Sequence, residues 1–487
     1  MAKTNYALIT GLTVAATLGG LLFGYDTAVI SGATDAIKEN FVKPWHLTEG
    51  WENLIWGFAV SCALLGCVIG ALLAGPISTR IGRKWGLLIA GVLFFVSSVG
   101  AGYPEFFWSL FGAAHEKALP FFIMYRLMGG TAIGMASMLA PMYIGEMAPT
   151  NIRGMLLTFE QIAIVVGINL VYFVNFWIQT GRSQDFLMHD GWRFMLASAA
   201  IPATLLIFFM LIVPETPRFL VLKDRDGEAL SLLKRLFGDE AAVKTLGEIK
   251  ETLVEHTRPL LSYGWTVVLV GIALSVFQQL VGINAVLYFA PHMFENMGAT
   301  RDAAFSQSAW FVGVSMTLFT LVATFTVEKF GRKPLLFWGA VVMAVAMVTL
   351  GFLFHLHLVN ATGATAGAAG GSSYIAIAAV VVYIIGFSFS WGPIVWVLLA
   401  EIYPNSIKGL AMSIGVAAQW IANFVVSQTF PMLDGSSALN AAFNHGFAYW
   451  LYGGCAVLAA VFVYRYVPET KGRSLEDMEN VWHRKKA

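Results

Sequence analysis

Twelve long apolar runs dominate this chain. Each is about 20 residues or longer, the length that an α-helix needs to cross a hydrocarbon layer of about 30 Å. Charged residues make up 12% of the 487 residues, about half their share in a typical soluble domain. The runs cover residues 6–30, 53–78, 85–103, 119–144, 155–180, 194–213, 263–294, 304–327, 335–355, 374–400, 410–432 and 446–464. The sequence therefore predicts an all-α membrane protein with twelve transmembrane helices.

A polar segment from Arg218 to Arg258 separates two groups of six runs. Its apolar residues recur at helical spacing, which predicts amphipathic helices outside the membrane. Basic residues are concentrated on alternate connections, in this segment and in the tail from Arg465 to Lys486. The positive-inside rule therefore places both termini and the polar segment in the cytoplasm. We expect a multi-pass protein of the plasma membrane, which in a bacterium is the inner membrane.

Short motifs recur in the two groups with an offset of about 250 residues. Gly82-Arg83-Lys84 returns as Gly331-Arg332-Lys333, Pro214-Glu215-Thr216 returns as Pro468-Glu469-Thr470, and Glu-x-x-Pro-x-x-x-Arg/Lys-Gly begins at Glu146 and at Glu401. Two six-helix repeats of the same orientation are expected to enclose a central solute site near the membrane midplane. We predict an N-terminal half (1–215), a cytoplasmic helical linker (216–262), a C-terminal half (263–467) and a cytoplasmic tail (468–487).

Several motifs, taken together, indicate a family. They are Gly19-Gly20-Leu-Leu-Phe23-Gly24-Tyr25-Asp26-Thr27, Gln278-Gln279-x-x-Gly282-Ile-Asn284 and Pro214-Glu-Thr-Pro-Arg218. Across essentially the whole chain, the motifs resemble those of the sugar porter family of the major facilitator superfamily, and within it those of bacterial D-xylose:proton symporters. The resemblance implies the major facilitator fold and proton-coupled monosaccharide symport by alternating access, with D-xylose as the expected sugar.

The same resemblance implies a transporter and not an enzyme, with no cofactor. The expected partners are a monosaccharide, a proton and the lipid bilayer, and we expect a monomer. A net charge of +1 gives no reason to expect a nucleic-acid partner. The chain has no Gly-x-x-x-x-Gly-Lys-Ser/Thr motif, which argues against ATP-driven pumping.

Three ionisable residues stand out within the apolar runs: Asp26, Arg126 and Glu160. A charge at the centre of a membrane helix costs about 2.5 to 3.5 kcal/mol on insertion scales, so each is a candidate functional residue. Asp26 and Arg126 lie in the outer parts of their helices and can meet at a similar depth. A buried carboxylate beside an arginine has a tunable pKa, which suits a transported proton. The resemblance supports this role, because proton-coupled members carry Asp at this position.

Two alternatives remain open for these residues. Asp26 and Arg126 could form a fixed structural ion pair, in which case the chain would be a facilitative hexose uniporter of the glucose type. Glu160 lies near the cytoplasmic end of its helix. We expect its carboxylate to snorkel to the interface rather than to provide a second protonation site.

Recognition of a sugar requires polar groups for its hydroxyls and aromatic faces for its C–H surfaces. Several Gln and Asn side chains interrupt otherwise apolar helices. Because an amide that faces lipid is costly, we expect most of these side chains to face a cavity or one another. By resemblance to the xylose porters, the sugar site comprises Gln161, Gln278, Gln279, Asn284, Trp396, Gln419 and Trp420, with Phe23, Tyr288 and Gly392 nearby. The alternative is that the amides join helices and the tryptophans form an interfacial belt.

Two positions depart from the family pattern. Met316 stands where members often carry Asn, so one hydroxyl contact is lost or comes from another group. Ile168 stands where related xylose porters can carry Gln, which leaves room for a less polar sugar face.

The repeated motifs place opposite charges at the cytoplasmic ends of helices. By resemblance, they form an inter-helix charge network that clamps the halves when the cytoplasmic side is closed; its members are Arg83, Glu146, Arg153, Glu215, Arg332, Glu401 and Lys408. The alternative is that these residues anchor helix ends and set the topology. His355 and His357 are spaced like metal ligands but lack a third ligand, so we predict no metal site.

Overall fold

The computed structural model describes residues 4–106, 118–149, 152–253, 259–359, 370–403 and 405–471. Within these ranges the chain forms helices and no β-strand. The described residues include twelve segments long and apolar enough to cross a membrane, from Tyr6–Gly32 to Gly446–Tyr466. They confirm the prediction of an all-α protein with twelve transmembrane helices.

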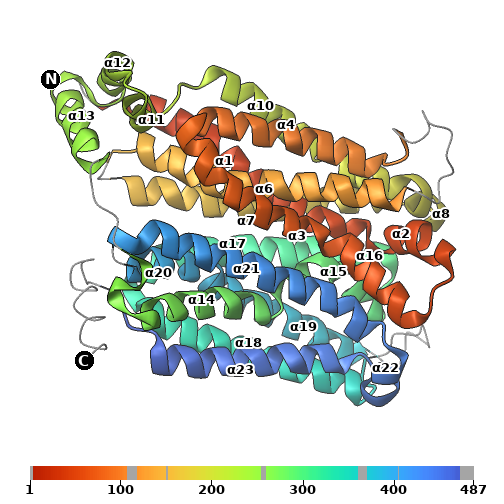
Figure 1. Cartoon of the computed structure of the whole chain (residues 1–487). Coiled ribbons are helices and arrows are strands. Elements are labelled where there is room, and N and C mark those ends of the chain that lie inside the picture. Colours follow the sequence, from red (N-terminus) through yellow and green to blue (C-terminus); the bar gives the residue numbers. More distant parts are fainter. Residues whose placement is uncertain are drawn as a thin grey trace.

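Six of these segments form the first half, which is the upper layer in Figure 1. Its elements are α1 (Tyr6–Val29), η1 (Ile30–Gly32), α2 (Thr34–Ile37), η2 (Lys38–Val42), η3 (Lys43–Trp45), α3 (Glu49–Arg80), α4 (Arg83–Gly102), α6 (Leu119–Met147), α7 (Arg153–Gln179), α8 (Gln184–Phe186), η5 (Leu187–Gly191), α9 (Trp192–Ala197) and α10 (Ala200–Ile212). Helix α6 packs against both α3 and α4, while α1 packs against α7.

The other six segments form the second half, the lower layer in Figure 1. Its elements are η6 (Leu260–Tyr263), α14 (Trp265–Leu280), α15 (Ile283–Asn296), α16 (Arg301–Gln307), η7 (Ser308–Val314), α17 (Ser315–Phe330), α18 (Arg332–His355), α19 (Gly370–Gly386), η8 (Phe387–Trp391), α20 (Gly392–Ile402), α21 (Asn405–Asp434), α22 (Ser437–Phe443) and α23 (Gly446–Tyr466). Helix α18 packs against α23 and α19, and α14 packs against α21.

Three helices follow the first half: α11 (Pro217–Leu222), α12 (Asp226–Phe237) and α13 (Asp239–Leu253). In α12, Leu232, Leu233 and Leu236 are buried while the charged residues face outward, as predicted for an amphipathic helix. Helix α11 contacts α3 and α6, and α12 contacts α1. We call this end of the bundle the linker side. The opposite end, where α8, α16 and α22 lie, is the far side (Figure 1).

Two membrane-spanning segments of the second half are interrupted within their length. Gly282 has a φ of +93° and separates α14 from α15, a conformation that glycine adopts without strain. The π-helical segment η8 leads into α20, which begins with Gly392 and Pro393. These breaks place Gln278 and Gln279 at the end of one helix and Asn284 at the start of the next.

Helices α1 and α7 approach each other closely at glycines. A β-carbon on Gly24 would overlap the backbone carbonyl of Ile164, and one on Gly167 would overlap the carbonyl of Leu21. Small residues that let backbones approach are the usual basis of helix packing in membranes, where burial gives no hydrophobic gain.

Hydrogen bonds between the halves lie at mid-depth or toward the far side in the described part of the chain. Tyr172 of α7 donates to the Leu287 carbonyl of α15 at 2.6 Å. Gln428 of α21 donates to the Leu54 carbonyl of α3 at 2.8 Å. The ion pairs described at the linker side instead join residues of one half or of the linker helices. The described structure is therefore held closed at its far side.

Tyr172→Phe is expected to shift the protein away from this closed arrangement by about 0.5 to 1.5 kcal/mol, the net contribution of one hydrogen bond, or about two- to tenfold in population. Spin labels placed on the two halves at the far side would report the shift as a longer distance. The matched control is Tyr383→Phe, because the Tyr383 hydroxyl donates to the Val281 carbonyl within one half. Equal distance distributions in Tyr172→Phe and the wild type would contradict the expectation.

Candidate functional site

A cavity lies between the two halves at mid-depth. Its lining includes nine of the ten residues predicted for the sugar site: Phe23, Gln161, Gln278, Gln279, Asn284, Gly392, Trp396, Gln419 and Trp420. They come from α1 and α7 of the first half and from α14, α15, α20 and α21 of the second half. A solute bound here would contact both halves at once.

The amides of α14 and α15 are held in a chain of hydrogen bonds. Gln278 Nε2 donates to the carbonyls of Trp391 (2.8 Å) and Gly392 (3.1 Å), at the junction of η8 and α20. Asn284 Nδ2 donates to Gln279 Oε1 at 2.5 Å, and Gln279 Nε2 lies 3.4 Å from Gln278 Oε1. These amides therefore have fixed orientations before any solute binds.

Two groups of α21 have unused hydrogen-bonding capacity. Gln419 Oε1 and Trp420 Nε1 are buried and have no hydrogen-bond partner among the described residues. Both residues line the cavity, and the Trp420 ring packs against Phe23 at a centroid distance of 5.4 Å. An unpaired buried acceptor and donor are costly without a ligand, so a polyhydroxylated solute suits this wall.

Tyr288 lies outside the cavity lining. Its buried side chain interacts with Asn423, which does line the cavity, and lies close to Asp26 and Arg126. Tyr288 thus connects the cavity wall of the second half with an ion pair of the first half.

The departures noted in the sequence also lie at the cavity: Met316 and Ile168 both line it. Thr27 and Thr320 supply hydroxyls that the sequence analysis did not select. A signal for each existed, because Thr27 follows Asp26 in the quoted motif and Thr320 lies one helical turn after Met316.

Asp26 of α1 and Arg126 of α6 form a buried ion pair. Arg126 Nη1 lies 2.9 Å from Asp26 Oδ1, and the side chain of Arg126 is 4% exposed and that of Asp26 is 8% exposed. Arg126 Nε has no hydrogen-bond partner in the described part of the chain. The sequence predicted this meeting from depth alone. Such a pair is costly to bury and strongly destabilising to break on one side, so its charge state is coupled to the surrounding packing.

A family model described as sugar (and other) transporter matches residues 12–482. This chain belongs to that sugar transporter family. It is 46% identical to the D-xylose-proton symporter of Escherichia coli strain K12, over 98% of this chain and 96% of the relative. It is 40% identical to the glucose facilitated diffusion protein of Zymomonas mobilis, over 99% of both chains. The family consists of transporters, so the chain is not an enzyme.

Solved structures support the same assignment. The inward open conformation of the xylose transporter XylE from E. coli matches with a TM-score of 0.85 and 43% identity, over 97% of this chain and 100% of that one. XylE bound to 6-bromo-6-deoxy-D-glucose matches with a TM-score of 0.81 and 45% identity, over 98% and 100%. The fold of this sugar transporter is therefore the major facilitator fold.

The structure corrects the prediction for Glu160. This residue of the sugar transporter is 6% exposed, and neither carboxylate oxygen has a hydrogen-bond partner among the described residues. It does not snorkel, because it points at Gly20 of α1, whose missing side chain leaves the space that the carboxylate fills. The close packing of α1 on α7 closes the route to the interface.

The repeated motifs of the sugar transporter form one charge cluster in each half. Arg83 donates to Glu146 from Nη2 at 2.8 Å and from Nε at 3.2 Å. In the second half, Arg332 donates to Glu401 from Nη2 at 2.7 Å and from Nε at 3.1 Å. Both arginines are buried. Each pair ties the helix after the Gly-Arg-Lys turn to a neighbouring helix of the same half.

A second carboxylate caps the same turn in each half. The backbone N–H groups of Arg83 and Lys84 donate to Glu215, and those of Arg332 and Lys333 donate to Glu469. Burial raises the pKa of the Glu215 carboxyl, whereas the hydrogen bonds from these backbone N–H groups act to lower it. Glu469 is not among the predicted members of the network, although the repeat of Pro-Glu-Thr marks it as the counterpart of Glu215.

Two further members of the network were predicted, Arg153 and Lys408. Arg153 is exposed and donates to the Ala148 carbonyl at 3.4 Å. Lys408 lies in α21, and its side chain is outside the part of the chain that the structure describes.

Proposed function

We propose that this sugar transporter carries D-xylose together with a proton. The observation that carries the proposal is the buried ion pair of Asp26 and Arg126, which lies beside a cavity lined by amides and aromatic rings. A relative that is 46% identical over nearly the whole chain is named a D-xylose-proton symporter. A carboxylate inside the membrane that can exchange its arginine partner for a proton is the group that such coupling needs.

Protonation of Asp26 would remove its charge and release Arg126 from the pair. The released guanidinium lies near Tyr288 of the second half, so the interaction between the halves changes with the proton. A proton that binds one arrangement of the halves better than the other shifts the equilibrium between them. The proton and the sugar thus act on the same conformational equilibrium.

The sugar would bind across the two halves. Gln161, Gln278, Gln279, Asn284 and Gln419 would contact its hydroxyls. The rings of Trp396 and Trp420 would cover its C–H surfaces. Phe23 and Gly392 would complete the wall of the cavity, and Tyr288 would lie outside the lining, next to Asn423. Pre-oriented amides reduce the entropic cost of binding.

The two six-helix halves, 1–215 and 263–467, would move as units by alternating access around this site. In this proposal the linker side is cytoplasmic, so both termini, the linker (216–262) and the tail (468–487) face the cytoplasm of a bacterial inner membrane. Closure of the far side and the TM-score of 0.85 with an inward open relative support an inward-facing arrangement. One chain contains both halves and the whole cavity, so a monomer suffices, and no nucleic acid takes part.

The charge clusters would act at the cytoplasmic side. When that side closes, Arg83, Glu146 and Glu215 of the first half approach Arg332 and Glu401 of the second half. Arg153 and Lys408 then add positive charge between the clusters. Such contacts would favour the outward-facing state and must separate when the cytoplasmic side opens.

A facilitative hexose uniporter is the second candidate. The relative from Zymomonas mobilis, which is 40% identical over 99% of both chains, is named a glucose facilitated diffusion protein. In this alternative, Asp26 and Arg126 form a fixed structural pair.

Sugar-induced proton uptake in proteoliposomes distinguishes the two candidates. D-Xylose is expected to drive proton influx, and D-glucose is the comparison sugar. Equilibration of either sugar with no proton movement would overturn the symport proposal and favour the uniporter.

A further inference from the structure

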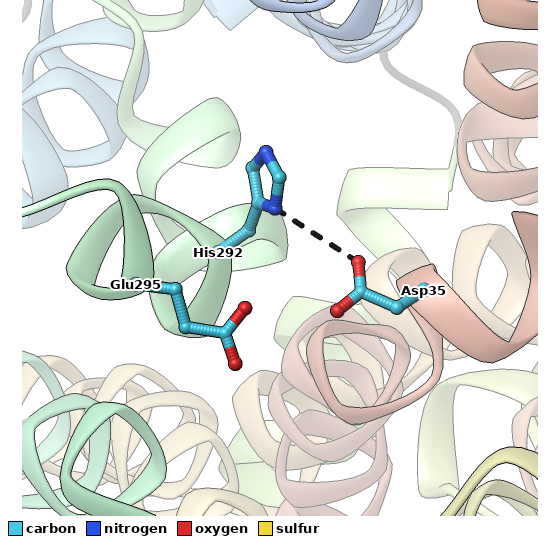
Figure 2. A group of neighbouring side chains, drawn as sticks. All are labelled: Asp35, His292 and Glu295. Carbon is cyan, nitrogen blue, oxygen red and sulfur yellow. Dashed lines mark ion pairs between the residues drawn. The ribbon is translucent and has the colours of Figure 1, made fainter. Parts of the chain in front are cut away.

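Three side chains converge at the far side, away from the sugar cavity. Asp35 comes from α2 of the first half, whereas His292 and Glu295 come from α15 of the second half. One donor atom from each of the three lies within 4.8 Å of the others. Figure 2 shows the side chains of His292 and Glu295 on one helix and that of Asp35 on another, with the three pointing toward one another. Each is partly exposed, so ions can reach them from this side.

Asp434 holds the His292 ring through Nε2, the ring nitrogen on the opposite side from the one that faces Asp35. Its Nε2 lies 3.1 Å from Asp434 Oδ2, and Asp434 Oδ1 lies 3.0 Å from Nδ1 of His445. A proton on Nε2 that is donated to Asp434 leaves the lone pair of Nδ1 facing Asp35. A carboxylate behind the outer nitrogen of a histidine is the usual second-shell arrangement of a metal ligand, because it fixes the tautomer and the ring orientation.

The distance between His292 and Asp35 also suits a shared cation. His292 Nδ1 lies 3.9 Å from Asp35 Oδ1, too far for a direct hydrogen bond. Two ligands at about 2.0–2.1 Å from a tetrahedral zinc ion are about 3.4 Å apart. Small side-chain movements would bring both atoms onto one ion.

The local charges leave room for a divalent cation. Three carboxylates gather here, those of Asp35, Glu295 and Asp434. Arg301 Nη2 lies 2.9 Å from Asp35 Oδ2, and its Nε lies 3.7 Å from Glu295 Oε1. The one guanidinium of Arg301 balances the charge of one of these three carboxylates. Because Arg301 binds Oδ2, Oδ1 of Asp35 is the oxygen that remains for a metal.

We propose that Asp35, His292 and Glu295 form a zinc site that clasps the two halves together at the far side. One imidazole and two carboxylates are ordinary zinc ligands, and water completes the tetrahedral shell. Because Asp35 belongs to one half and the other two ligands to the second, the far side cannot open without losing a ligand. Zinc therefore stabilises the far-side-closed arrangement and slows transport.

The first test measures binding without any sugar. Tag-free full-length protein is titrated with zinc in competition with a chromophoric chelator. One equivalent is expected to bind, and Asp35→Asn, His292→Gln and Glu295→Gln are each expected to weaken binding more than about tenfold. Asp434→Asn is expected to weaken it about 10- to 100-fold by freeing the His292 ring. The control is His357→Gln, an exposed histidine outside this group, which should bind zinc like the wild type.

Zinc binding that is equal in the wild type and in all three ligand variants would overturn the proposal, as would no binding to the wild type. Retained sugar binding shows that each variant is folded. The effect on transport rests on the proposed function and is measured separately, as slower sugar exchange when zinc is added at the far side. A failure of sugar-proton coupling would leave the binding result intact, so the two proposals can fail independently.

Discussion

Asp26→Asn is expected to abolish sugar-driven proton uptake while the sugar still equilibrates across the membrane. Asparagine keeps the shape and a hydrogen-bonding oxygen for Arg126, which lies 2.9 Å from Asp26, but it cannot take up a proton. One proton crossing 100 mV supplies about 2.3 kcal/mol, which is about fortyfold in sugar concentration. In proteoliposomes at that potential, the wild type should accumulate D-xylose toward this limit, and Asp26→Asn should stop at equal concentrations.

Glu160→Gln is the matched control for this substitution. Glu160 is also a buried carboxyl of the first half, but no cationic partner is described for it. We expect Glu160→Gln to keep sugar-driven proton uptake. Proton uptake that persists in Asp26→Asn and disappears in Glu160→Gln would transfer the coupling role to Glu160.

Gln419→Leu is expected to weaken D-xylose binding about 10- to 100-fold. Gln419 Oε1 is buried at the cavity and has no protein partner among the described residues, so the substitution breaks no described hydrogen bond of the protein. A sugar hydroxyl that loses its partner on binding costs about 1 to 3 kcal/mol. Quenching of tryptophan fluorescence by D-xylose measures the loss, because Trp396 and Trp420 line the same cavity.

Deoxysugars provide the control within the same experiment. The analogue that lacks the hydroxyl bound by Gln419 should bind equally to the wild type and to Gln419→Leu, whereas other deoxy analogues should still bind the variant more weakly. A uniform loss for every analogue would mean that the substitution deforms the cavity, and an unchanged affinity for D-xylose would remove Gln419 from the site.

The sequence by itself determined the twelve membrane spans, the two repeats and nine of the residues that line the cavity. Hydropathy suffices for the spans, because a helix satisfies all of its backbone hydrogen bonds within one segment and needs no partner to be recognised. Motif identity selected nine residues that the structure brings to one cavity. The pairing of Asp26 with Arg126 followed from depth, since two opposite charges inside a membrane are far less costly together than apart.

Only the tertiary structure decided the environment of individual side chains. Glu160 is buried because Gly20 leaves a space on the facing helix, and no local pattern records which helices face each other. Tyr288 reaches the ion pair rather than the cavity for the same reason. The group of Asp35, His292 and Glu295 joins residues 257 positions apart, so no spacing rule could find it. Sequence fixes what each helix can bury, whereas the packing of the halves decides which polar groups meet.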